Sequence, residues 1–528
     1  MQYHEKSKSL ILRVRDPERI TDHIPGDRAR VVMFNDKPHV QVKLGIDEAK
    51  VLRNLGYNAP APIRYSYHWP RNENKVPQPF DHQIVTSEFL TLHQRCICLN
   101  DMGTGKTLSA LWAADYMMSR GMVKKAIIVT PLSTTDAVWA NEIRQHFLFS
   151  RNVAVLVGDK ERRRKLLASD VDFYVINHDG LKSIYRELEA RKDINLWIVD
   201  EAAEGYRNAK TDRYATLNSL MRPTDYVWLM TGTPCPNAPT DAWALARLMR
   251  NPQAPKYFNT FKSQVMLQLT QYKWVPKADA YQQAYNLLQP GIRFKKEDCL
   301  KDMPPVTFQM RDCAFSAEQN RVYKEMHDEL VASVGGANVT AANAAVKLQK
   351  LLQVGVGTIY DGAGGSYAID AAPRLQLVEE LIGEASKKVL VFVPFKAALR
   401  MVAEHLRKKG YTVETVDGDT SPTERKRIFF EMQNQENPRV LVAHPKTTSH
   451  GLTMTAADTT IWYAPIFSLE TFEQANNRMN RPGQKHNMTV AMIAANALER
   501  KLYAALEGKA HMQDSVLSLY KKEVGLAT

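Results

Sequence analysis

Short apolar runs alternate with amphipathic segments along most of the chain from residue 80 onward. The runs end in small or polar residues, and the stretches between them have the composition of helices. The first set of runs covers 96–99, 126–131, 173–178, 196–199 and 227–230. Strands that alternate with helices predict a parallel sheet with helices on both faces, and ligands of such sheets lie at the carboxyl ends of the strands.

A second set of runs has the same character. It covers 388–395, 412–416, 439–443 and 460–463. Because one hydrophobic core rarely extends beyond ~250–300 residues, a chain of 528 residues requires several domains. We therefore expect an α/β protein with two parallel-sheet lobes.

The first 79 residues predict a small α+β accessory domain instead. Strands are expected over 9–16, 31–34 and 40–44, the last two forming a hairpin, and a helix over 45–56. A segment rich in Pro and Asn, 70–79, then leads into the first lobe.

Three aromatic residues in this domain have two interpretations. Tyr65, Tyr67 and Trp69 alternate along 64–69, which predicts a strand with the three rings on one face. The rings form either a buried strand face, the interpretation we favour, or a platform for unstacked bases.

Apolar residues at helical spacing occupy the remaining segments. These segments are 257–288, 316–334, 341–352 and 498–524. The domains expected are an accessory domain that engages DNA (1–79), the first lobe (80–250), a helical linker region (251–378), the second lobe (379–497) and a C-terminal helical brace (498–528).

Composition narrows the class of protein. The net charge of +13 favours a polyanionic partner. Five cysteines without a C-x-x-C pair predict neither a disulfide framework nor a zinc site. The N-terminus lacks the apolar segment of a signal peptide, and no apolar run approaches ~18 residues, so we expect no membrane span. These features indicate the cytoplasm or, in a eukaryote, the nucleus.

The segment after the first predicted strand carries the clearest chemistry. Gly103, Thr104, Gly105, Lys106 and Thr107 precede a run of helix formers, which predicts strand, glycine loop and helix. Glycines let backbone N–H groups surround a phosphate chain, and the helix adds its positive end. Lys106 would then reach the β- and γ-phosphates of ATP, and the Thr107 hydroxyl would bind Mg²⁺. Asn100 occupies a position where the strict pattern has glycine.

Two adjacent carboxylates follow the run 196–199 directly. Because an apolar strand directs them to the predicted ligand edge, we assign Asp200 to the Mg²⁺ shell and Glu201 as the base that accepts a proton from the attacking water. Near the C-terminus, Arg478 and Arg481 lie three residues apart, which on a helix places them on one face. From there they would neutralise charge on the transferred phosphoryl group.

The order of these motifs resembles helicase superfamily two, and more narrowly its Swi/Snf-type ATPases. The resemblance rests on 103–107, on 200–203, on Thr231-Gly232-Thr233-Pro234 and on 474–484, and it extends over 80–484. It implies two RecA-like lobes, ATP with Mg²⁺ and DNA as the partner. It further implies that Gln83, in 79–83, recognises adenine and that Gln474 belongs to the nucleotide site with Arg478 and Arg481.

The chain departs from the family pattern in two places. Ala203 replaces the usual His of the Asp-Glu-x-His box, and 448–452 replaces a glycine-rich motif. His450 within this second segment is expected to be a loop or nucleic-acid contact, because no second metal ligand lies at useful spacing.

Contacts to the nucleic-acid backbone are expected from loops that follow strands. The candidates are Ser133, Thr134, His178, Lys396, Lys446 and Thr447. Such contacts to phosphates read no sequence. The basic segment 160–165 either extends this surface or is a solvated helix face.

These expectations leave three functional classes. The first is a DNA translocase or helicase that acts as a monomer on duplex, forked or single-stranded DNA and remodels forks, junctions or annealed strands. The second is a remodeller of protein–nucleic-acid complexes with little strand separation. The third, an inactive scaffold, is disfavoured because Lys106, Glu201 and Arg481 are all present. The lean region between the lobes is typical of a small fork or junction enzyme, by analogy, and is compatible with a phage or bacterial source.

Overall fold

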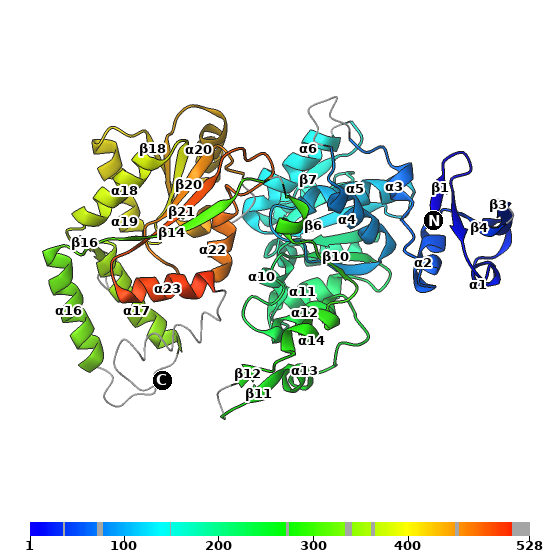
Figure 1. The fold of residues 1–528 in the computed structure, drawn as a ribbon, viewed down its shortest axis with the longest axis horizontal. Coiled ribbons are helices and arrows are strands. Elements are labelled where there is room, and N and C mark those ends of the chain that lie inside the picture. Colours follow the sequence, from blue (N-terminus) through cyan, green and yellow to red (C-terminus); the bar gives the residue numbers. More distant parts are fainter. Residues whose placement is uncertain are drawn as a thin grey trace. The chain divides into compact units, whose positions relative to one another are not determined.

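The protein divides into two compact units in a computed structural model (Figure 1). The structure describes residues 1–34, 37–70, 78–147, 149–270, 274–301, 303–332, 341–360, 365–448 and 453–508. Unit 1 comprises Met1–Cys235 and Pro239–Cys299, and unit 2 comprises Pro236–Ala238 and Leu300–Thr528.

The core of unit 1 is a parallel sheet of seven strands in the order β13-β5-β10-β9-β6-β8-β7. Its strands are β5 (Arg95–Cys98), β6 (Lys125–Thr130), β7 (Val153–Val155), β8 (Phe173–Asn177), β9 (Ile194–Val199), β10 (Tyr226–Met230) and β13 (Gly291–Ile292). Five of these are the strands that the apolar runs predict. The expected parallel sheet is confirmed.

Helices cover both faces of this sheet. One face packs on α4 (Asp81–Leu92), α5 (Lys106–Ser119) and α6 (Asn141–Phe147). The other packs on α7 (Lys160–Ala168), α8 (Gly180–Ser183), α9 (Tyr185–Ala190), α10 (Ala202–Tyr206), α11 (Asp212–Leu220) and α12 (Ala242–Leu248). Alternate residues of one strand enter different clusters: Leu196 and Ile198 face α5, whereas Trp197 and Val199 face α10. Continuous apolar runs therefore form strands that are buried on both faces.

Unit 2 contains a second parallel sheet, of six strands in the order β14-β21-β20-β17-β19-β18. Its strands are β14 (Val306–Asp312), β17 (Lys388–Phe392), β18 (Val413–Val416), β19 (Val440–Ala443), β20 (Ala457–Trp462) and β21 (Met488–Ala494). The faces are covered by α18 (Ala372–Glu384) and α19 (Lys396–Lys408) on one side and by α20 (Pro422–Asn434) and α22 (Leu469–Asn476) on the other. Two RecA-like lobes are thus confirmed.

The segment 251–378 is shared between the two units. Within unit 1 it forms α13 (Phe258–Val265), a hairpin of β11 (Met266–Gln268) and β12 (Trp274–Pro276), α14 (Ala280–Leu287), β13 and α15 (Lys296–Cys299). Within unit 2 it forms β14, α16 (Ala317–Ala332), α17 (Ala341–Gly355), β15 (Thr358–Tyr360) and β16 (Ser366–Ala368). The prediction of helix throughout 257–288 is wrong, because Trp274, Val275 and Pro276 favour an edge strand over a helix.

The N-terminal residues form an antiparallel sheet in the order β1-β2-β4-β3. Its strands are β1 (Gln2–His4), β2 (Ser9–Arg13), β3 (Ala29–Phe34) and β4 (Lys37–Lys43), with the helices α1 (Glu18–Thr21) and α2 (Ile46–Asn54). The predicted hairpin and helix are confirmed. The expected C-terminal helix is confirmed over α23 (Ala497–Glu507), and 509–524 lie outside the described residues.

The strand predicted over 64–69 is wrong. Pro62 opens a short helix, α3 (Ile63–Ser66), because its ring fixes a helical φ at the helix start. Tyr67 and Trp69 pack edge-on against each other, the Tyr67 hydroxyl donates to Asp115 at 2.8 Å, and Trp69 also packs against Trp112 of α5. Only Tyr65 is well exposed, and it stacks on Tyr3. The rings therefore form no common platform for bases.

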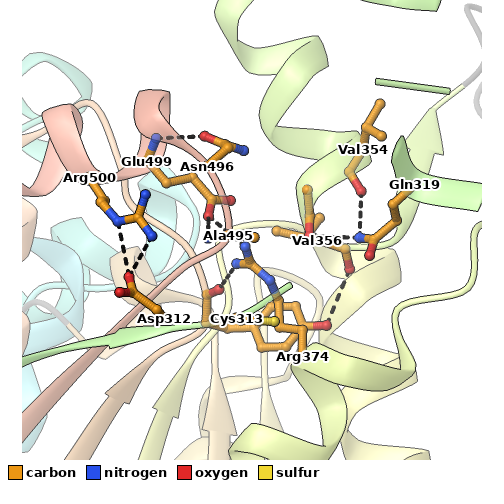
Figure 2. Close-up of polar contacts among 12 residues, drawn as sticks. Asp312, Cys313, Gln319, Val354, Val356, Arg374, Ala495, Asn496, Glu499 and Arg500 are labelled. Atoms are coloured by element: carbon orange, nitrogen blue, oxygen red, sulfur yellow. Dashed lines mark hydrogen bonds and ion pairs between the residues drawn. The ribbon is translucent and has the colours of Figure 1, made fainter. Parts of the chain in front are cut away.

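A buried polar network joins the helices of unit 2 to its sheet (Figure 2). Arg374 of α18 and Glu499 of α23 are 1% and 0% exposed, and their side chains pair at 2.5 Å. Arg374 also donates to the carbonyl of Tyr463, and the backbone N–H of Ala495 donates to Glu499 at 2.6 Å. The charged pair thus connects α18, α23 and the segment after β20.

The end of α17 packs directly on this pair. A side chain at Gly355 would place its Cβ 2.7 Å from Oε1 of Glu499, so the helix approaches closely only because glycine stands there. The side chain of Gln319 in α16 donates to the carbonyls of Val354 and Gly355, both at 3.0 Å (Figure 2). The elements around the sheet are therefore fixed by buried polar contacts as well as by apolar packing.

We predict that Arg374→Met destabilises unit 2 by about 3–5 kcal/mol, because it leaves the Glu499 carboxylate buried and unpaired. The double variant R374M/E499L should recover most of this loss, since it removes both charges. Hydrogen exchange of α18 and α23 under native conditions measures the effect within unit 2. Arg500→Met is the control, because the Arg500–Asp312 pair is exposed and worth at most ~1 kcal/mol. Equal protection in R374M and the wild type would contradict the assignment.

Candidate functional site

The glycine loop lies between β5 and α5 as predicted. Gly103 and Gly105 have φ of 81° and 78°, in the left-handed region that glycine adopts readily. Helix α5 begins at Lys106 directly after Gly105, so its first N–H groups and its positive end face the loop. The Lys106 ammonium donates to the carbonyls of Asn100 at 2.8 Å and Asp101 at 3.2 Å. This loop has the backbone conformation and the charge of an anion site.

Asp200 is held rigidly at the end of β9. Its Oδ2 accepts hydrogen bonds from the Thr130 hydroxyl at 3.1 Å and from the Trp139 indole at 2.9 Å, and its Oδ1 accepts from the Glu201 N–H at 3.0 Å. Trp139 comes from a π-helical turn, Thr135–Ala140, a rare form that is frequent at functional sites. A carboxylate has about four acceptor positions, so Asp200 retains one for a cation or its water shell.

Glu201 has an unusual backbone. Its φ is 46°, which is costly for a residue with a side chain, by about 1–3 kcal/mol. The strained turn ends β9 and begins α10, whose Gly205 N–H donates to the carbonyl of Glu201 at 3.1 Å. Strain of this kind is concentrated at functional sites, where it fixes the direction of a reactive side chain. Ala203, which stands where the family has His, is buried within α10.

The strand order places these groups at one edge. Strand β10 lies between β5 and β9, and its following residue Thr231 donates from its N–H to the carbonyl of Cys98 at 3.0 Å. Gly232 packs on the glycine loop, since a Cβ there would lie 3.4 Å from Cγ of Met102. Burial raises the pKa of the Cys98 thiol to about 11, while Lys106 opposes the shift and Asp200 adds to it, so both charges act on the same thiol. Lys106 and Asp200 therefore lie at the same edge of the sheet.

Helix α4 holds the other side of the glycine loop. Gln83 accepts the N–H of Phe80 at 2.9 Å, and its Nε2 lies against Gly105, where a Cβ would be only 1.9 Å away. The His82 ring bonds the carbonyl of Thr104 at 2.9 Å, and burial lowers the pKa of His82. The structure therefore places Gln83 and His82 against the glycine loop, and the recognition of adenine by Gln83 stays a prediction.

Sequence reasoning missed the contribution of 291–296. The Asn100 side chain, 1% exposed, donates to the Thr86 hydroxyl at 2.8 Å and accepts the N–H of Phe294 at 2.9 Å. The Asp101 carboxylate accepts the N–H of Lys296 at 3.1 Å. The loop is thereby joined to α4 and to the last residues of unit 1. The signal was Asn100 itself, because a buried amide in place of glycine requires hydrogen-bond partners.

Arg478 and Arg481 do not lie on a helix. Helix α22 ends at Asn476, and both arginines belong to the turn that follows, so the predicted shared helical face is wrong. The Arg478 guanidinium is buried in unit 2 and donates to the carbonyl of Gln474 at 3.0 Å. Arg481 is half-buried and donates to the Thr453 hydroxyl at 3.2 Å.

The side chain of Gln474 is also enclosed in unit 2. It is 2% exposed, and its amide donates to Glu470 at 3.4 Å. The Gln474 amide is therefore not presented to solvent in this structure, and the backbone carbonyl of Gln474 is the group that accepts from Arg478.

Two of the expected nucleic-acid contacts in unit 1 are buried. The Thr134 hydroxyl bonds Thr130 at 2.6 Å, and His178 bonds the Tyr206 hydroxyl at 3.1 Å. Thr134 supports Thr130, which holds Asp200, and His178 packs over α10 because Gly205 leaves room for its ring. Both side chains are thus enclosed in this structure whereas Ser133 is exposed, and the role of these residues as nucleic-acid contacts stays a prediction.

The candidates in unit 2 lie where β17 and β19 end. Lys396, at the start of α19, pairs with Asp419 at 2.7 Å, which raises the pKa of Lys396. Lys446, in α21 (Pro445–Thr448), is exposed, and the Thr447 hydroxyl donates to the carbonyl of His444 at 2.7 Å. Burial lowers the pKa of His444, and the charges of Lys446 and Lys396 lower it further. His450 and the rest of 449–452 lie outside the described residues.

The remaining expectations concern the basic segment 160–165, the cysteines, metal-binding groups and membrane-spanning helices. The segment 160–165 opens helix α7, and Arg164 there pairs with Glu161 and Glu187. All five cysteines are unbridged. Within the described ranges, no three His, Cys, Asp or Glu side chains gather as a metal-binding group, and no helix is long and apolar enough to cross a bilayer.

Comparisons with protein families give two matches. A family described as "SNF2-related domain" matches residues 63–355, and one described as "Helicase conserved C-terminal domain" matches 373–483. The first match covers more than half of the chain and begins after the N-terminal sheet.

Individual relatives agree with these matches. An Arabidopsis thaliana protein, "ISWI chromatin-remodeling complex ATPase CHR17", is 26% identical over 77% of this chain, which spans only 39% of that protein. "Putative protein p41" of Acyrthosiphon pisum secondary endosymbiont phage 1 is 24% identical over 85% of this chain and 99% of its own length. The solved "Sulfolobus solfataricus SWI2/SNF2 ATPase core in complex with dsDNA" is 20% identical, covers 86% of this chain and 98% of that one, and has a TM-score of 0.39.

We predict that Asn100→Ala loosens the attachment of 291–296 to the glycine loop, which then rests on the contacts of Asp101 and on the pairing of β13 with β5. The variant removes the acceptor of the Phe294 N–H and the donor to Thr86, at a cost of about 1–3 kcal/mol. Hydrogen exchange should become faster in 291–299, while the exposed amide variant Gln282→Ala leaves this segment unchanged. Unchanged exchange in the Asn100 variant would show that the amide does not hold the segment.

Proposed function

The chain belongs to the SNF2-related family, whose domains imply ATP hydrolysis, and on this premise we propose that it is a DNA translocase or helicase that remodels forks, junctions or annealed strands. The observation that carries the proposal is that the glycine loop follows β5 while Asp200 and Glu201 follow β9, so that, with β10 between these two parallel strands, all of them lie at the carboxyl edge of one sheet. The curated plant relatives are much longer than this chain, so its substrates and partners remain proposals.

ATP fits the edge of unit 1 by the chemistry of its residues. Gly103, Thr104 and Gly105 offer backbone N–H groups to the phosphate chain, and Lys106 would exchange its two carbonyl acceptors for phosphate oxygens. Thr107, on the first turn of α5, and Asp200 would hold Mg²⁺, which supplies positive charge against the phosphates when bound. Gln83, packed on Gly105, lies where it can meet the base.

Glu201 is the residue that we assign as general base. The strained turn fixes its direction, and Asp200 holds its backbone N–H, so the carboxylate is positioned without reorganisation. Accepting a proton from the attacking water contributes about 10²–10⁴ in rate.

Arg481 and Arg478 provide the second half of the proposed mechanism. Arg478 is enclosed by unit 2 and holds the turn, whereas Arg481 is closer to solvent. We propose that Arg481 neutralises charge on the transferred phosphoryl group while ATP is bound. Since an arginine of this kind binds the ATP state better than the ADP state, hydrolysis changes the preferred conformation and drives movement.

The positive net charge of the chain and its exposed lysines at strand ends favour DNA as the partner. Lys446 and Ser133 are exposed at the strand ends of their units, and Lys396, at the start of α19, has Asp419 as its present partner. Contacts of this kind bind phosphates, so binding should weaken steeply with salt and show little base preference. Because one chain carries both sets of residues, we expect it to act as a monomer. The phage relative supports the cytoplasm of a bacterial cell as the place of action.

We predict that DNA stimulates ATP hydrolysis and that Lys106→Ala lowers kcat by at least ~10²-fold, because the charge on the phosphates is lost. The experiment compares stimulation by single-stranded, duplex and forked DNA with displacement of an annealed strand. Lys182→Ala, an exposed lysine paired with Asp212, is the matched control.

The outcomes separate the proposed activities. Stimulation with displacement indicates a helicase or fork remodeller. Stimulation without displacement indicates a translocase or a remodeller of protein–nucleic-acid complexes. If no nucleic acid raises the ATPase rate, the proposed function is wrong.

A further inference from the structure

The N-terminal sheet has one covered face and one open face. Leu10, Leu12, Val40 and Val42 form a core with Ile20 of α1, Leu52 of α2 and their neighbours, so the helices cover one side. Side chains alternate along a strand, and the remaining residues therefore point to the opposite side. The SNF2-related match begins only at residue 63, so this sheet is not part of the shared ATPase domain.

The pairing register shows which residues share the open face. One row across the sheet contains Gln2, Ile11, Gln41 and Arg30, a second contains His4, Ser9 and Lys43, and a third contains Arg13, His39 and Val32. These rows contain arginine and lysine but neither aspartate nor glutamate. Within the described residues, Arg13, Arg30 and Lys43 form no ion pair. The open face is thus positively charged, polar and not neutralised by its own sheet.

A chain of hydrogen bonds orders this face before any ligand binds. The Arg30 guanidinium donates from Nε and Nη2 to Oε1 of Gln41, at 3.1 and 3.0 Å. The Gln41 amide in turn donates to the Ser7 hydroxyl at 3.0 Å, and this hydroxyl bonds Nδ1 of His4 at 2.7 Å. The bonds run from Arg30 of β3 to His4 of β1, so Gln41 fixes the Arg30 guanidinium, whose other N–H groups can donate to a ligand.

The face is hollowed at this network. A depression of about 150 Å³ is lined by the polar and charged residues Ser7, Ser9, Asp27, Arg28, Arg30, Gln41 and Lys43. Arg28 is anchored by the buried carboxylate of Glu48 at 2.5 Å, so that its charge is compensated. Arg30 and Lys43 together exceed the single charge of Asp27, which leaves the hollow positive.

We propose that this open face is a second nucleic-acid site, which binds the phosphate backbone beside the motor. Arginine in a fixed plane, a lysine and a hydroxyl are the groups that proteins use for phosphates. Strands lie ~4.8 Å apart, so the cations on β2, β4 and β3 extend over ~10 Å. Successive phosphates of one strand are further apart than the ~3.4 Å that each nucleotide rises along the helix axis, and the face therefore matches at most about three phosphates. The proposal rests on DNA being the partner of the motor.

The test compares two double variants that remove equal charge. R30Q/K43Q acts on the open face, whereas R19Q/K50Q acts on α1 and α2, on the covered side. Binding of the full chain to a fluorescent duplex of mixed sequence is measured over a series of salt concentrations. Each lost phosphate contact lowers the slope of log K against log salt by ~0.9, so R30Q/K43Q should lower it by about 2 and weaken binding roughly tenfold at low salt.

The ATPase provides an independent readout. R30Q/K43Q should require more DNA for half-maximal stimulation, with unchanged basal rate and unchanged rate at saturating DNA. R19Q/K50Q should behave as the wild type in both assays.

The other possible results of these two assays contradict either the second site alone or the second site together with the proposed function. If the wild type binds DNA and R30Q/K43Q or the reversed variant R30E/K43E binds equally well, the second site is wrong while the motor stands. If both double variants lose affinity equally, the effect is one of net charge and the face is not a site. If the wild type neither binds DNA nor is stimulated by it, this proposal and the proposed function fail together.

Discussion

The strand order of the unit 1 sheet is the constraint on which the candidate site depends. Because β10 lies between β5 and β9 with all three strands parallel, the residues that follow them emerge side by side. The glycine loop, the strained turn at Glu201 and the segment at Thr231 are brought together by backbone pairing, although the chain between them is long. Any change that displaced β10 would separate Lys106 from Asp200.

A second constraint joins the glycine loop to the exit of unit 1. The Asn100 side chain and the backbone of Asp101 hold 291–296 along β5, directly before the chain leaves unit 1 at Leu300. In a motor of the proposed kind, the loop that binds phosphate and the segment that leads to the other unit are thus in direct contact. Within unit 2, the polar network around Arg374 fixes the helices α18 and α23 on the sheet.

The sequence was sufficient for the central strands of both sheets and for the glycine loop, but not for β7, β13, β14 and β21. The central strands are apolar runs buried on both faces, such as 196–199, and the glycines stand where a positive φ is required. The sequence was not sufficient where an element has few residues or where contacts with distant parts of the chain determine its structure. Strand β13 has only two residues, too few for a hydrophobic pattern. The alternation of Tyr67 and Trp69 predicted a strand, whereas in the structure it reflects the packing of these rings near α5. Thr134 and His178 follow strands, as expected of contacts, but polar partners inside unit 1 hold them. The turn of Arg478 and Arg481 could not be distinguished from a helix by spacing alone.

The central claim is that chemistry at the edge of unit 1 requires an arginine from unit 2. The most direct measurement is the ATPase rate of Arg481→Ala at saturating DNA, together with its affinity for a non-hydrolysable ATP analogue, with Arg500→Ala as the matched arginine control in unit 2. We predict that kcat falls by ~10³-fold or more while the affinity for the analogue is largely retained. A kcat equal to that of the wild type would contradict the account.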